Sequence, residues 1–378
     1  MISKLPNTGT SIFTVMSKMA LDYKAINLSQ GFPDFEVSPE VISLINKHMM
    51  DGRNQYAPMP GVPALLERIA SKVNGIHGCN YDGLSEVTIT AGATESIYSA
   101  ITMLVHPGDE VIIFEPAYDS YEPNVLINGG VPVRIKLRLP DFSIPWEEVK
   151  QKITNKTRLI MINSPHNPTG SVLNKQDMMQ LSSIVENSEI YVLSDEVYEH
   201  IIFDDLPHES ILKYPEIMNK GIAVSSFGKT FHATGWKVGY SVAPRHLTEE
   251  IRKIHQFVAF SVNTPIQWAF AEFLENPKNY LQVPAIFQKK RDLFLSHTKN
   301  SRFKPFPSSG TYFQLMSYEG MFDMGDYELA QKLTKESGLA SIPISVFYNN
   351  RQDDHILRFC FAKSDETLEK GAEICCQL

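Results

Sequence analysis

Residues 221–237 read GIAVSSFGKTFHATGWK, an apolar strand-like run that ends in two serines and leads into Gly228-Lys229-Thr230. Comparable β-branched runs recur along the chain, and helical stretches lie between several of them. The runs are VTIT (87–90), EVIIF (110–114), VPVRIKL (131–137), RLIMIN (158–163), IYVLS (190–194), GIAVSS (221–226) and VGYSVA (238–243). Near-continuous apolar strands separated by helices indicate an α/β fold with a mostly parallel sheet that helices cover on both faces.

The pattern changes in the last third of the chain. Helices are expected at 94–105, 174–187 and 246–258, and residues 265–299 read as one or two long helices. Beyond them TYFQLM (311–316), LASIPIS (339–345) and HILRFCFA (355–362) are strand-like, with helices at 326–337 and 365–376. The segment before about residue 45 has no strand pattern. We therefore expect a large domain at 46–280 and a smaller α+β domain built from 1–45 and 281–378.

Composition excludes several classes of function. The 378 residues carry a net charge of −8 with mixed signs, so no basic field favours nucleic acid. No apolar stretch approaches a membrane span or a signal-peptide core. The four cysteines, Cys79, Cys360, Cys375 and Cys376, have no CxxC spacing, and no metal site is expected. These features predict a cytoplasmic protein.

Lys229 is the first candidate for chemistry. A hydroxyl, Ser226, lies three residues before it and a second cation, Lys237, follows. That arrangement is typical of a lysine that forms a Schiff base with pyridoxal phosphate, with phosphate-binding groups on either side. The rival is a P-loop, but its spacing requires glycine at 223, where the chain has alanine. If Lys229 is considered without the rest of the chain, the alternative is an ordinary surface lysine that faces solvent.

Other polar candidates stand just after strands, at the edge where ligands bind in open α/β sheets. They are Gly92, Ala93 and Thr94 after VTIT, Tyr118 after EVIIF, Asn167 after RLIMIN, Asp195 and Tyr198 after IYVLS, and Lys229 after GIAVSS. Because all of these residues follow this one rule, a shared functional site is favoured over an ordinary structural role for each of them.

Each of these residue types suits one part of a pyridoxal phosphate site. Asp195 would keep a pyridine nitrogen protonated, although it could instead cap a helix. Tyr198 and Asn167 would hold the ring oxygen; a core tyrosine and a plain Asn-Pro loop are the alternatives. The small residues of AGATES (91–96) open a helix whose amide groups would bind phosphate, and Tyr118 would stack on the ring.

Arg358 interrupts the apolar strand ILRFCFA. A buried guanidinium requires an anionic partner, and the α-carboxylate of a substrate, bound by two hydrogen bonds, would serve. An edge-strand arginine that faces water is the alternative.

Six segments together resemble class I aminotransferases of PLP fold type I, and especially methionine aminotransferases related to kynurenine/glutamine transaminases. They are LSQGFPDF, NQYAPMPG, SPHNPTG, SDEVYEH, SSFGKTFHATGWKVGY and LRFCFAK. The resemblance runs from about residue 5 to 376, with the same order and spacing.

The resemblance implies a role for each candidate. Lys229, Asp195 and Tyr198 are the expected catalytic residues, and the rest hold cofactor or substrate. The cofactor-binding set is Gly92, Ala93, Thr94, Tyr118, Asn167, Asp195, Tyr198, Ser226, Lys229 and Lys237, with Tyr56 from a partner subunit; the substrate-binding set is Gly31, Asn167 and Arg358. A homodimer with a shared site is implied. Two departures, Ala91 where relatives often have Gly or Ser and Lys237 where others have Arg, remove no required group.

The implied reaction moves an amino group to a 2-oxo acid through a Lys229 Schiff base and pyridoxamine phosphate. Three rivals are a cysteine-conjugate β-lyase on the same fold, a regulator that would need a recognition domain, and a dinucleotide oxidoreductase, for which no GxGxxG follows a strand. The apolar segments SIFTVM (11–16) and AFSVNTP (259–265) offer no cation for a distal carboxylate. We therefore expect methionine as donor, then glutamine, aromatic amino acids and kynurenine, with aspartate poor.

Overall fold

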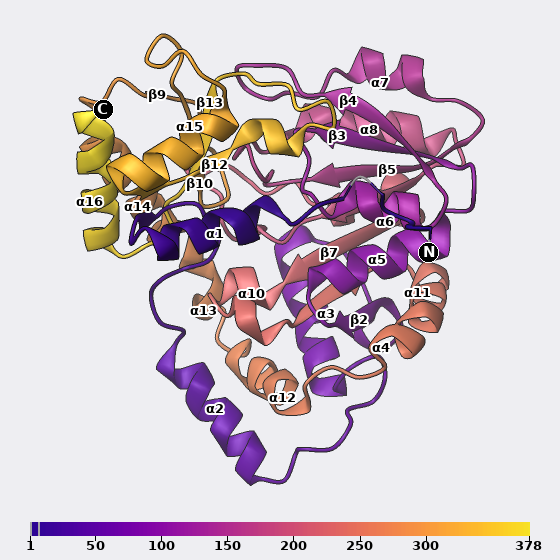
Figure 1. Cartoon of the computed structure of the whole chain (residues 1–378). Helices are drawn as coiled ribbons and strands as arrows, with labels where there is room; N and C mark the ends of the chain where they lie inside the picture. Colours follow the sequence, from indigo (N-terminus) through magenta and orange to yellow (C-terminus); the bar gives the residue numbers. More distant parts are fainter. Residues whose placement is uncertain (1, 7) are drawn as a thin grey trace.

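Seven strands form the central sheet of the protein (Figure 1). The computed structural model describes residues 2–6 and 8–378. The strands are β2 (Val87–Thr90), β3 (Glu110–Glu115), β4 (Val131–Lys136), β5 (Thr157–Asn163), β6 (Tyr191–Asp195), β7 (Gly221–Ser226) and β8 (Gly239–Val242). Their order is β2-β8-β7-β6-β5-β3-β4, and β8 alone runs antiparallel to its neighbours. The predicted mostly parallel α/β fold is confirmed.

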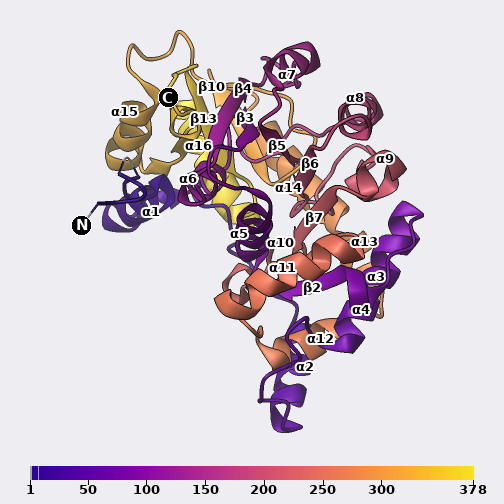
Figure 2. The same cartoon turned by 90° about the vertical axis from the view of Figure 1, so that its right-hand side faces the viewer.

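Helices cover both faces of this sheet because its strands are apolar on both faces. In β3, Val111 and Ile113 pack into one hydrophobic cluster, and Ile112 and Phe114 into the other. The first cluster includes α5 (Ala93–Leu104), α6 (Tyr121–Ile127) and α11 (Arg245–Val258); the second includes α3 (Pro63–His77), α7 (Trp146–Lys152) and α8 (Lys175–Glu186). Figure 2 shows α5 and α6 on one side of the twisted strands and α8 on the other. Because successive side chains of a strand point to opposite faces of the sheet, the protein has one hydrophobic core on each face.

A second, antiparallel sheet forms the smaller unit. Its strands, in spatial order, are β12 (Ile342–Pro343), β13 (Ile356–Cys360), β10 (Phe313–Ser317) and β9 (Lys304–Pro305). The helices of this unit are α14 (Val283–His297), α15 (Asp326–Lys332) and α16 (Asp365–Gln377). The N-terminal helix α1 (Ile12–Asp22) packs against β11 (Leu339–Ala340) and β12. The N-terminal segment thus joins the last part of the chain in space, as Figure 1 shows.

Several local expectations require correction. Residues 265–299 form three helices, α12 (Thr264–Phe273), α13 (Lys278–Leu281) and α14, because Pro277 and Pro284 interrupt the helical hydrogen bonding. The N-terminal segment does contain a strand, the two-residue β1 (Ile26–Asn27), which pairs in parallel with β11. The run at 311–316 becomes a strand only from residue 313, since Thr311 has a φ of 63°.

The remaining short elements connect the layers. They are α2 (Pro39–Met50), α4 (Gly83–Glu86), α9 (Pro215–Met218) and α10 (Phe227–Thr230). Helix α2 crosses the predicted boundary at residue 45 and packs against α12. The division into 46–280 and 1–45 with 281–378 stays a prediction.

A buried polar network joins α3 to the strands that carry the candidate residues. Lys72 Nζ donates to Glu199 Oε1 at 2.8 Å and to the Tyr240 hydroxyl at 2.9 Å, and Ser225 Oγ donates to the same carboxylate oxygen. Burial raises the pKa of Glu199, but Lys72 and the other donors outweigh it and hold the pKa well below its ordinary value. Glu199 and Ser225 are the chain neighbours of Tyr198 and Ser226, so the network fixes the backbone beneath two candidate site residues.

We expect Lys72→Met to lower the free energy of unfolding by about 3–5 kcal/mol, because it leaves the Glu199 charge buried without its cation. Urea unfolding at neutral pH measures the change, and Lys72→Met combined with Glu199→Gln should recover most of it. Lys47→Met is the matched control: it removes an exposed pair with Glu272 and should cost less than about 1 kcal/mol. Equal losses for the two single variants would contradict the assignment.

Candidate active site

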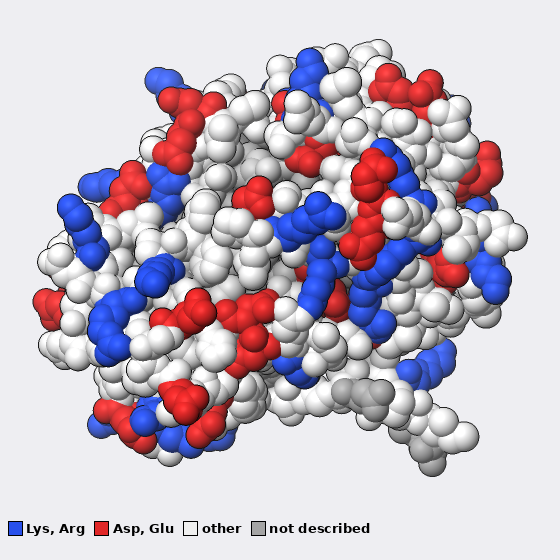
Figure 3. All heavy atoms as spheres, turned by 90° about the horizontal axis from the view of Figure 1, so that it is seen from above, with Lys and Arg blue, Asp and Glu red and all other residues white. Residues whose placement is uncertain are grey.

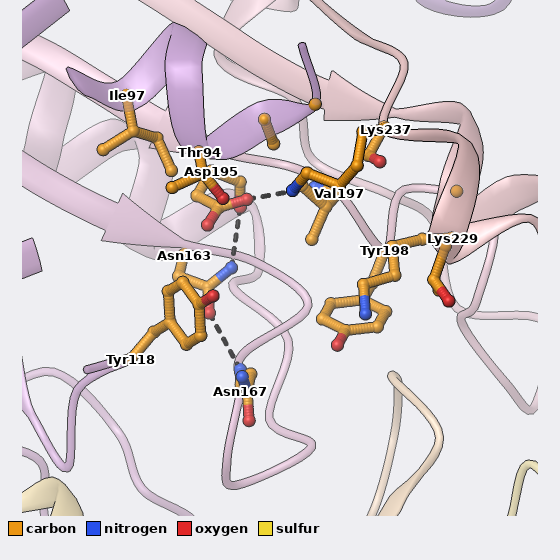
Figure 4. A pocket seen from close by; sticks show the side chains of 15 residues that line it. Thr94, Ile97, Tyr118, Asn163, Asn167, Asp195, Val197, Tyr198, Lys229 and Lys237 are labelled. Carbon is orange, nitrogen blue, oxygen red and sulfur yellow. Dashed lines mark hydrogen bonds between the residues drawn. The ribbon is translucent and has the colours of Figure 1, made fainter. Parts of the chain in front are cut away.

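A cavity of about 170 Å³ opens where the parallel strands end. Most of the candidate residues line it, and they come from segments far apart in the sequence (Figure 4). Those on its wall are Gly92, Ala93, Thr94, Tyr118, Asn167, Asp195, Tyr198, Ser226, Lys229 and Lys237. Lys237 shares this edge because β8 runs antiparallel, which places the residues before it beside the ends of the other strands. The structure therefore brings these residues together, and their individual roles stay predictions.

The N-terminus of α5 forms one end of the cavity. Gly92 caps this twelve-residue helix with a φ of 76°, and a Cβ there would lie 3.0 Å from Lys237 Nζ. The left-handed backbone and the close ammonium together require glycine. Amide groups of the first helical turn, the Thr94 and Ser226 hydroxyls and the Lys237 charge converge here, a donor set that suits a phosphate group.

Asp195 ends β6 and is 5% exposed. Its Oδ2 accepts a 2.6 Å hydrogen bond from the Tyr121 hydroxyl, and Oδ1 accepts a longer one, 3.3 Å, from the Val197 amide. Burial raises the pKa of Asp195 to about 6, against the opposing effect of the Tyr121 hydrogen bond. Tyr121 keeps its proton because burial and the Asp195 charge raise its own pKa well above the ordinary value. The carboxylate is thus oriented but only partly compensated.

Lys229 lies on the short helix α10 with its amine toward the small unit. Its Nζ donates to the Tyr312 hydroxyl at 2.7 Å and to the Gly31 carbonyl at 3.3 Å. Burial lowers the pKa of Lys229 to about 8, and the nearby Arg358 charge lowers it further. A lysine with a pKa near neutrality is suited to nucleophilic attack and to proton transfer.

The remaining wall residues form a connected polar set. Asn163, the last residue of β5, donates from Nδ2 to the Asp195 carbonyl at 2.8 Å and accepts from the Asn167 amide at 2.8 Å. Figure 4 shows these bonds as dashed lines, with the Tyr118 ring on one side of the cavity and Lys229 on the other. Burial raises the pKa values of Tyr118, to about 12, and of Tyr198, so both phenols are protonated at neutral pH.

Arg358 is fully buried on β13, which lies between β12 and β10. The edge-strand alternative is therefore wrong. The guanidinium donates to Asn167 Oδ1 at 2.7 Å and to the Ser29 carbonyl at 3.2 Å, and it stacks on the Phe313 ring at 3.8 Å. Burial lowers the pKa of Arg358 to about 10, so the side chain stays charged at neutral pH.

Three buried or half-buried charges around this cavity have no opposite charge beside them. Among the described residues, no salt-bridge partner lies within 4.0 Å of Asp195, Lys229 or Arg358, and Arg358 Nε has no hydrogen-bond partner. Uncompensated charges at such depth are costly and mark ligand sites. The Asp195 carboxylate would suit the ring nitrogen of pyridoxal phosphate, and the Arg358 guanidinium would suit a substrate carboxylate. The residues present therefore fit the predicted cofactor.

Three predicted residues, Gly31, Tyr56 and Arg358, do not line the cavity within one chain. Gly31 and Arg358 each contact a residue of the wall: the Gly31 carbonyl accepts from Lys229, and Arg358 donates to Asn167. Tyr56 is 82% exposed and lies edge-on to Phe260, with ring centroids 5.5 Å apart. Its predicted contribution to a partner's phosphate site stays untested.

Sequence reasoning missed three residues of the site. Tyr121 orients Asp195, Asn163 links Asp195 to Asn167, and Tyr312 contacts Lys229. Asn163 carried a usable signal, since it is a polar residue at the carboxyl end of the apolar run RLIMIN. The two tyrosines carried none, because aromatic residues near strands are usually core.

No group of three or more His, Cys, Asp or Glu side chains in the described part of the chain is placed to hold a metal ion. None of the described helices is both long and apolar enough to cross a membrane. On the face shown in Figure 3, acidic and basic side chains are interspersed over both units.

Comparison with known proteins assigns the family. The family model "Aminotransferase class I and II" matches residues 23–374. A methionine aminotransferase of Escherichia coli is 47% identical over 372 residues, which cover 98% of this chain and 96% of that protein. A kynurenine–oxoglutarate transaminase of Dictyostelium discoideum is 34% identical, over 96% of this chain and 93% of that protein.

Solved structures agree. The crystal structure of an E. coli protein identified as a methionine aminotransferase superposes with a TM-score of 0.97 and 46% identity, over 100% of this chain and 99% of that one. An N-succinyldiaminopimelate aminotransferase from Mycobacterium tuberculosis gives 0.96 and 33%, over 100% and 99%. With this match along nearly its whole length, and with a lysine, an aspartate and a helix N-terminus gathered at one cavity, the chain belongs to the class I and II aminotransferases.

Proposed function

We propose that this aminotransferase uses pyridoxal phosphate to move the amino group of methionine to a 2-oxo acid. Glutamine, aromatic amino acids and kynurenine are the next donors, and aspartate is a poor one. The observation that carries the proposal is a set of charges without a salt-bridge partner among the described residues at one cavity: Asp195 and Lys229 line it, and Arg358 bonds Asn167 on its wall. The similarity to a methionine aminotransferase supports the choice of donor.

The walls described above would hold the cofactor at both ends. Amide groups at the start of α5, with Ser226 and Lys237, take the phosphate, while Asp195 pairs with the ring nitrogen and Tyr198 and Asn167 with the ring oxygen. When bound, the cofactor supplies an electron-accepting ring that stabilises negative charge at the substrate Cα. Tyr121 keeps the Asp195 carboxylate aimed at the nitrogen by its 2.6 Å bond.

Lys229 has two roles in this proposal. Its Nζ attaches the cofactor covalently, and once released the same nitrogen removes and returns the proton at the substrate Cα. A pKa of about 8 gives a substantial fraction of neutral amine near neutral pH without making the conjugate acid too strong. Burial, which lowers that pKa, also keeps water away from the reacting atoms.

Arg358 would bind the substrate α-carboxylate. Its guanidinium is fixed by Asn167 and Phe313 and retains an unused Nε–H, so a carboxylate would complete its hydrogen bonding. The Gly31 backbone lies on the same side, because the Lys229 amine reaches its carbonyl. These contacts depend on no substrate side chain, so they serve every amino acid alike.

The surroundings of Arg358 favour an apolar side chain. Phe13 from α1 and Phe347 lie 5.2 and 5.4 Å from the guanidinium, and their rings are 6.0 Å apart. The only cations on the described cavity wall are Lys229 and Lys237, both assigned to the cofactor. Arg53 instead stacks on Trp268 in a separate groove, and Arg351 donates to the Val346 carbonyl. A distal carboxylate would therefore enter unpaired.

A homodimer would complete the site. The exposed Tyr56–Phe260 pair lies where two segments are tied together: Thr264 Oγ1 donates to the Gln55 carbonyl at 2.7 Å, and Ser261 Oγ to the Ala57 carbonyl at 3.1 Å. Exposed aromatic surface held this rigidly is typical of an interface. We propose that Tyr56 and residues 259–265 reach the cavity of the partner. A cytoplasmic location stays a prediction from the sequence.

Lys229→Ala should abolish transamination, by about 10⁴-fold or more, while pyridoxal phosphate still binds non-covalently. Borohydride reduction followed by peptide mapping of the wild type should place the cofactor on Lys229. The exposed Lys18→Ala is the control and should retain activity and labelling. Cofactor found on another lysine would refute the assignment.

Asp195→Asn should stabilise the cofactor-free fold at neutral pH and weaken the binding of the cofactor. The pKa of Asp195 is raised on folding, so its favourable contribution is present below about pH 4 and is lost as pH rises through about 6. We expect the cofactor-free variant to be more stable than wild type by about 2–3 kcal/mol at pH 7.5, with no gain at pH 4. Its affinity for pyridoxal phosphate should fall, because the ring nitrogen loses its partner. Urea unfolding at both pH values and equilibrium dialysis measure these changes, and a pH-independent stability difference would contradict the cause given.

Methionine should exceed aspartate in kcat/KM by about 10²-fold or more with a common oxo acid, because desolvating an unpaired carboxylate costs several kcal/mol. Arg358→Ala should lower kcat/KM for both donors by a similar factor, which separates α-carboxylate binding from side-chain selection. Aspartate within about tenfold of methionine in the wild type would exclude the apolar-pocket proposal.

A further inference from the structure

Tyr312, to which neither the sequence nor the proposed function assigns a role, completes a hydrogen-bonded triangle. Lys229 Nζ lies 2.7 Å from its hydroxyl, the hydroxyl lies 2.6 Å from the Gly31 carbonyl oxygen, and Nζ lies 3.3 Å from that oxygen. The Tyr312 ring is fully buried and packs edge-on against Tyr198 at 5.1 Å, so the hydroxyl is held in place.

Counting protons fixes the direction of each bond in the triangle. A carbonyl oxygen only accepts, so the single phenol proton of Tyr312 goes to Gly31. The phenol oxygen can then only accept from Lys229, which donates to both oxygens; the protonated amine is the stronger donor because its hydrogen bonds are charge-assisted. Burial raises the pKa of Tyr312 well above its ordinary value, so its proton is present throughout the physiological range. The triangle therefore requires a Lys229 amine that is not covalently engaged, and it is strongest when that amine is protonated.

Gly31 belongs to a loop that cations hold by its backbone. Arg358 donates to the Ser29 carbonyl at 3.2 Å, Lys363 donates to the Phe32 carbonyl at 2.8 Å, and Lys229 donates to the Gly31 carbonyl between them. A Cβ at Gly31 would lie 2.7 Å from the Phe313 ring, so the loop fits closely at this point. Arg358 and Lys363 are permanent anchors, whereas Lys229 is the nitrogen that reacts.

We propose that Tyr312 is a positioning residue that accepts a hydrogen bond from the free, protonated Lys229 amine. Through the shared contact with Gly31, residues 29–32 become more ordered when that amine is free and less ordered when it is covalently engaged. The inference rests on the proposed function, in which Lys229 alternates between a bound and a free state and Gly31 lies beside the substrate carboxylate. Release of the amine and ordering of the carboxylate-binding loop then become one event.

The other groups that face Lys229 do not complete a comparable triangle. Arg358 and Cys360 approach from β13, Asp195 from β6, Lys237 from the segment before β8, and Tyr198 from the loop after β6. None of them lies within hydrogen-bond distance of Nζ, which bonds only Tyr312 and Gly31 among the described residues. Tyr312 is therefore the group whose removal should change the state of the amine most directly.

The first test measures the pKa of Lys229 in the full-length chain without added cofactor, from the pH dependence of its labelling rate by an amine-reactive reagent resolved by peptide mass spectrometry. Tyr312→Phe should lower that pKa by roughly one unit, because the ammonium loses a fixed acceptor. Tyr318→Phe is the matched control: Tyr318 is buried just after β10, the strand that Tyr312 precedes, and it donates to the Met324 carbonyl at 3.1 Å without lining the cavity. A merely structural role would leave the pKa unmoved.

The second test follows hydrogen exchange of the peptide that contains residues 29–32. Lys229→Met and Tyr312→Phe should each increase exchange there by about tenfold or more, while Tyr318→Phe leaves it unchanged. An unchanged Lys229 pKa in Tyr312→Phe, or loop exchange that does not respond to Lys229→Met, overturns the proposal. Borohydride labelling distinguishes a failure of this inference from a failure of the proposed function. If the cofactor is attached to Lys229 but the Lys229 pKa is unchanged in Tyr312→Phe, only this inference is overturned. If the cofactor is attached to another lysine, the proposed function is overturned.

Discussion

Uncompensated charge at one cavity is the constraint on which the rest of the structure depends. Asp195, Lys229 and Arg358 are each brought out of full contact with water, and none has an opposite charge beside it among the described residues. Folding therefore carries an electrostatic penalty that the two hydrophobic cores and the helices around them must offset. A ligand that supplies groups of opposite charge would remove that penalty, so charges that lower the stability of the fold also favour binding.

The buried network of Lys72 and Glu199 illustrates the contrast. There a cation and an anion meet directly, with Tyr240 and Ser225 completing the hydrogen bonds, and the result is structural support. One residue along the chain, Tyr198 faces the cavity instead. The compensated Lys72–Glu199 pair therefore supports the backbone next to the cavity, while Asp195 and Lys229 on the cavity wall keep their charges without a salt-bridge partner among the described residues.

The large unit lines the cavity, and the small unit contacts its wall residues through Arg358 and Tyr312. Asp195 ends β6 of the large sheet and Lys229 lies on α10, whereas Arg358 lies on β13 and Tyr312 just before β10 of the small unit. The Ala117 amide, next to Tyr118, donates to the Phe347 carbonyl at 2.9 Å, and the Asn349 amide donates to Glu115 at 2.8 Å. A movement of the small unit would therefore shift Arg358 and the loop that carries Tyr118 together.

Much of the architecture was open to prediction because the sequence signal is local. VTIT at 87–90 and GIAVSS at 221–226 became β2 and β7 with the expected bounds, since a strand buried on both faces must be apolar throughout. The rule that ligands lie beyond the carboxyl ends of strands then placed Asp195, Asn167 and Lys229 at one edge. The break at Pro277 and Pro284 and the two-residue β1 were missed, because a short strand depends on its partner β11 rather than on its own residues.

The sequence by itself determined the class of fold, the family and the residues that meet at the cavity, because residue types at fixed spacings around strands carry that information. Only the tertiary structure decided how those residues are connected. Tyr121 lies 74 positions before Asp195 in the chain, and Tyr312 lies 281 positions after Gly31, yet each pair is joined by a hydrogen bond of 2.6 Å. No periodicity or motif records such a bond, because a buried tyrosine has the same local pattern whether its hydroxyl meets a carboxylate, a carbonyl or nothing.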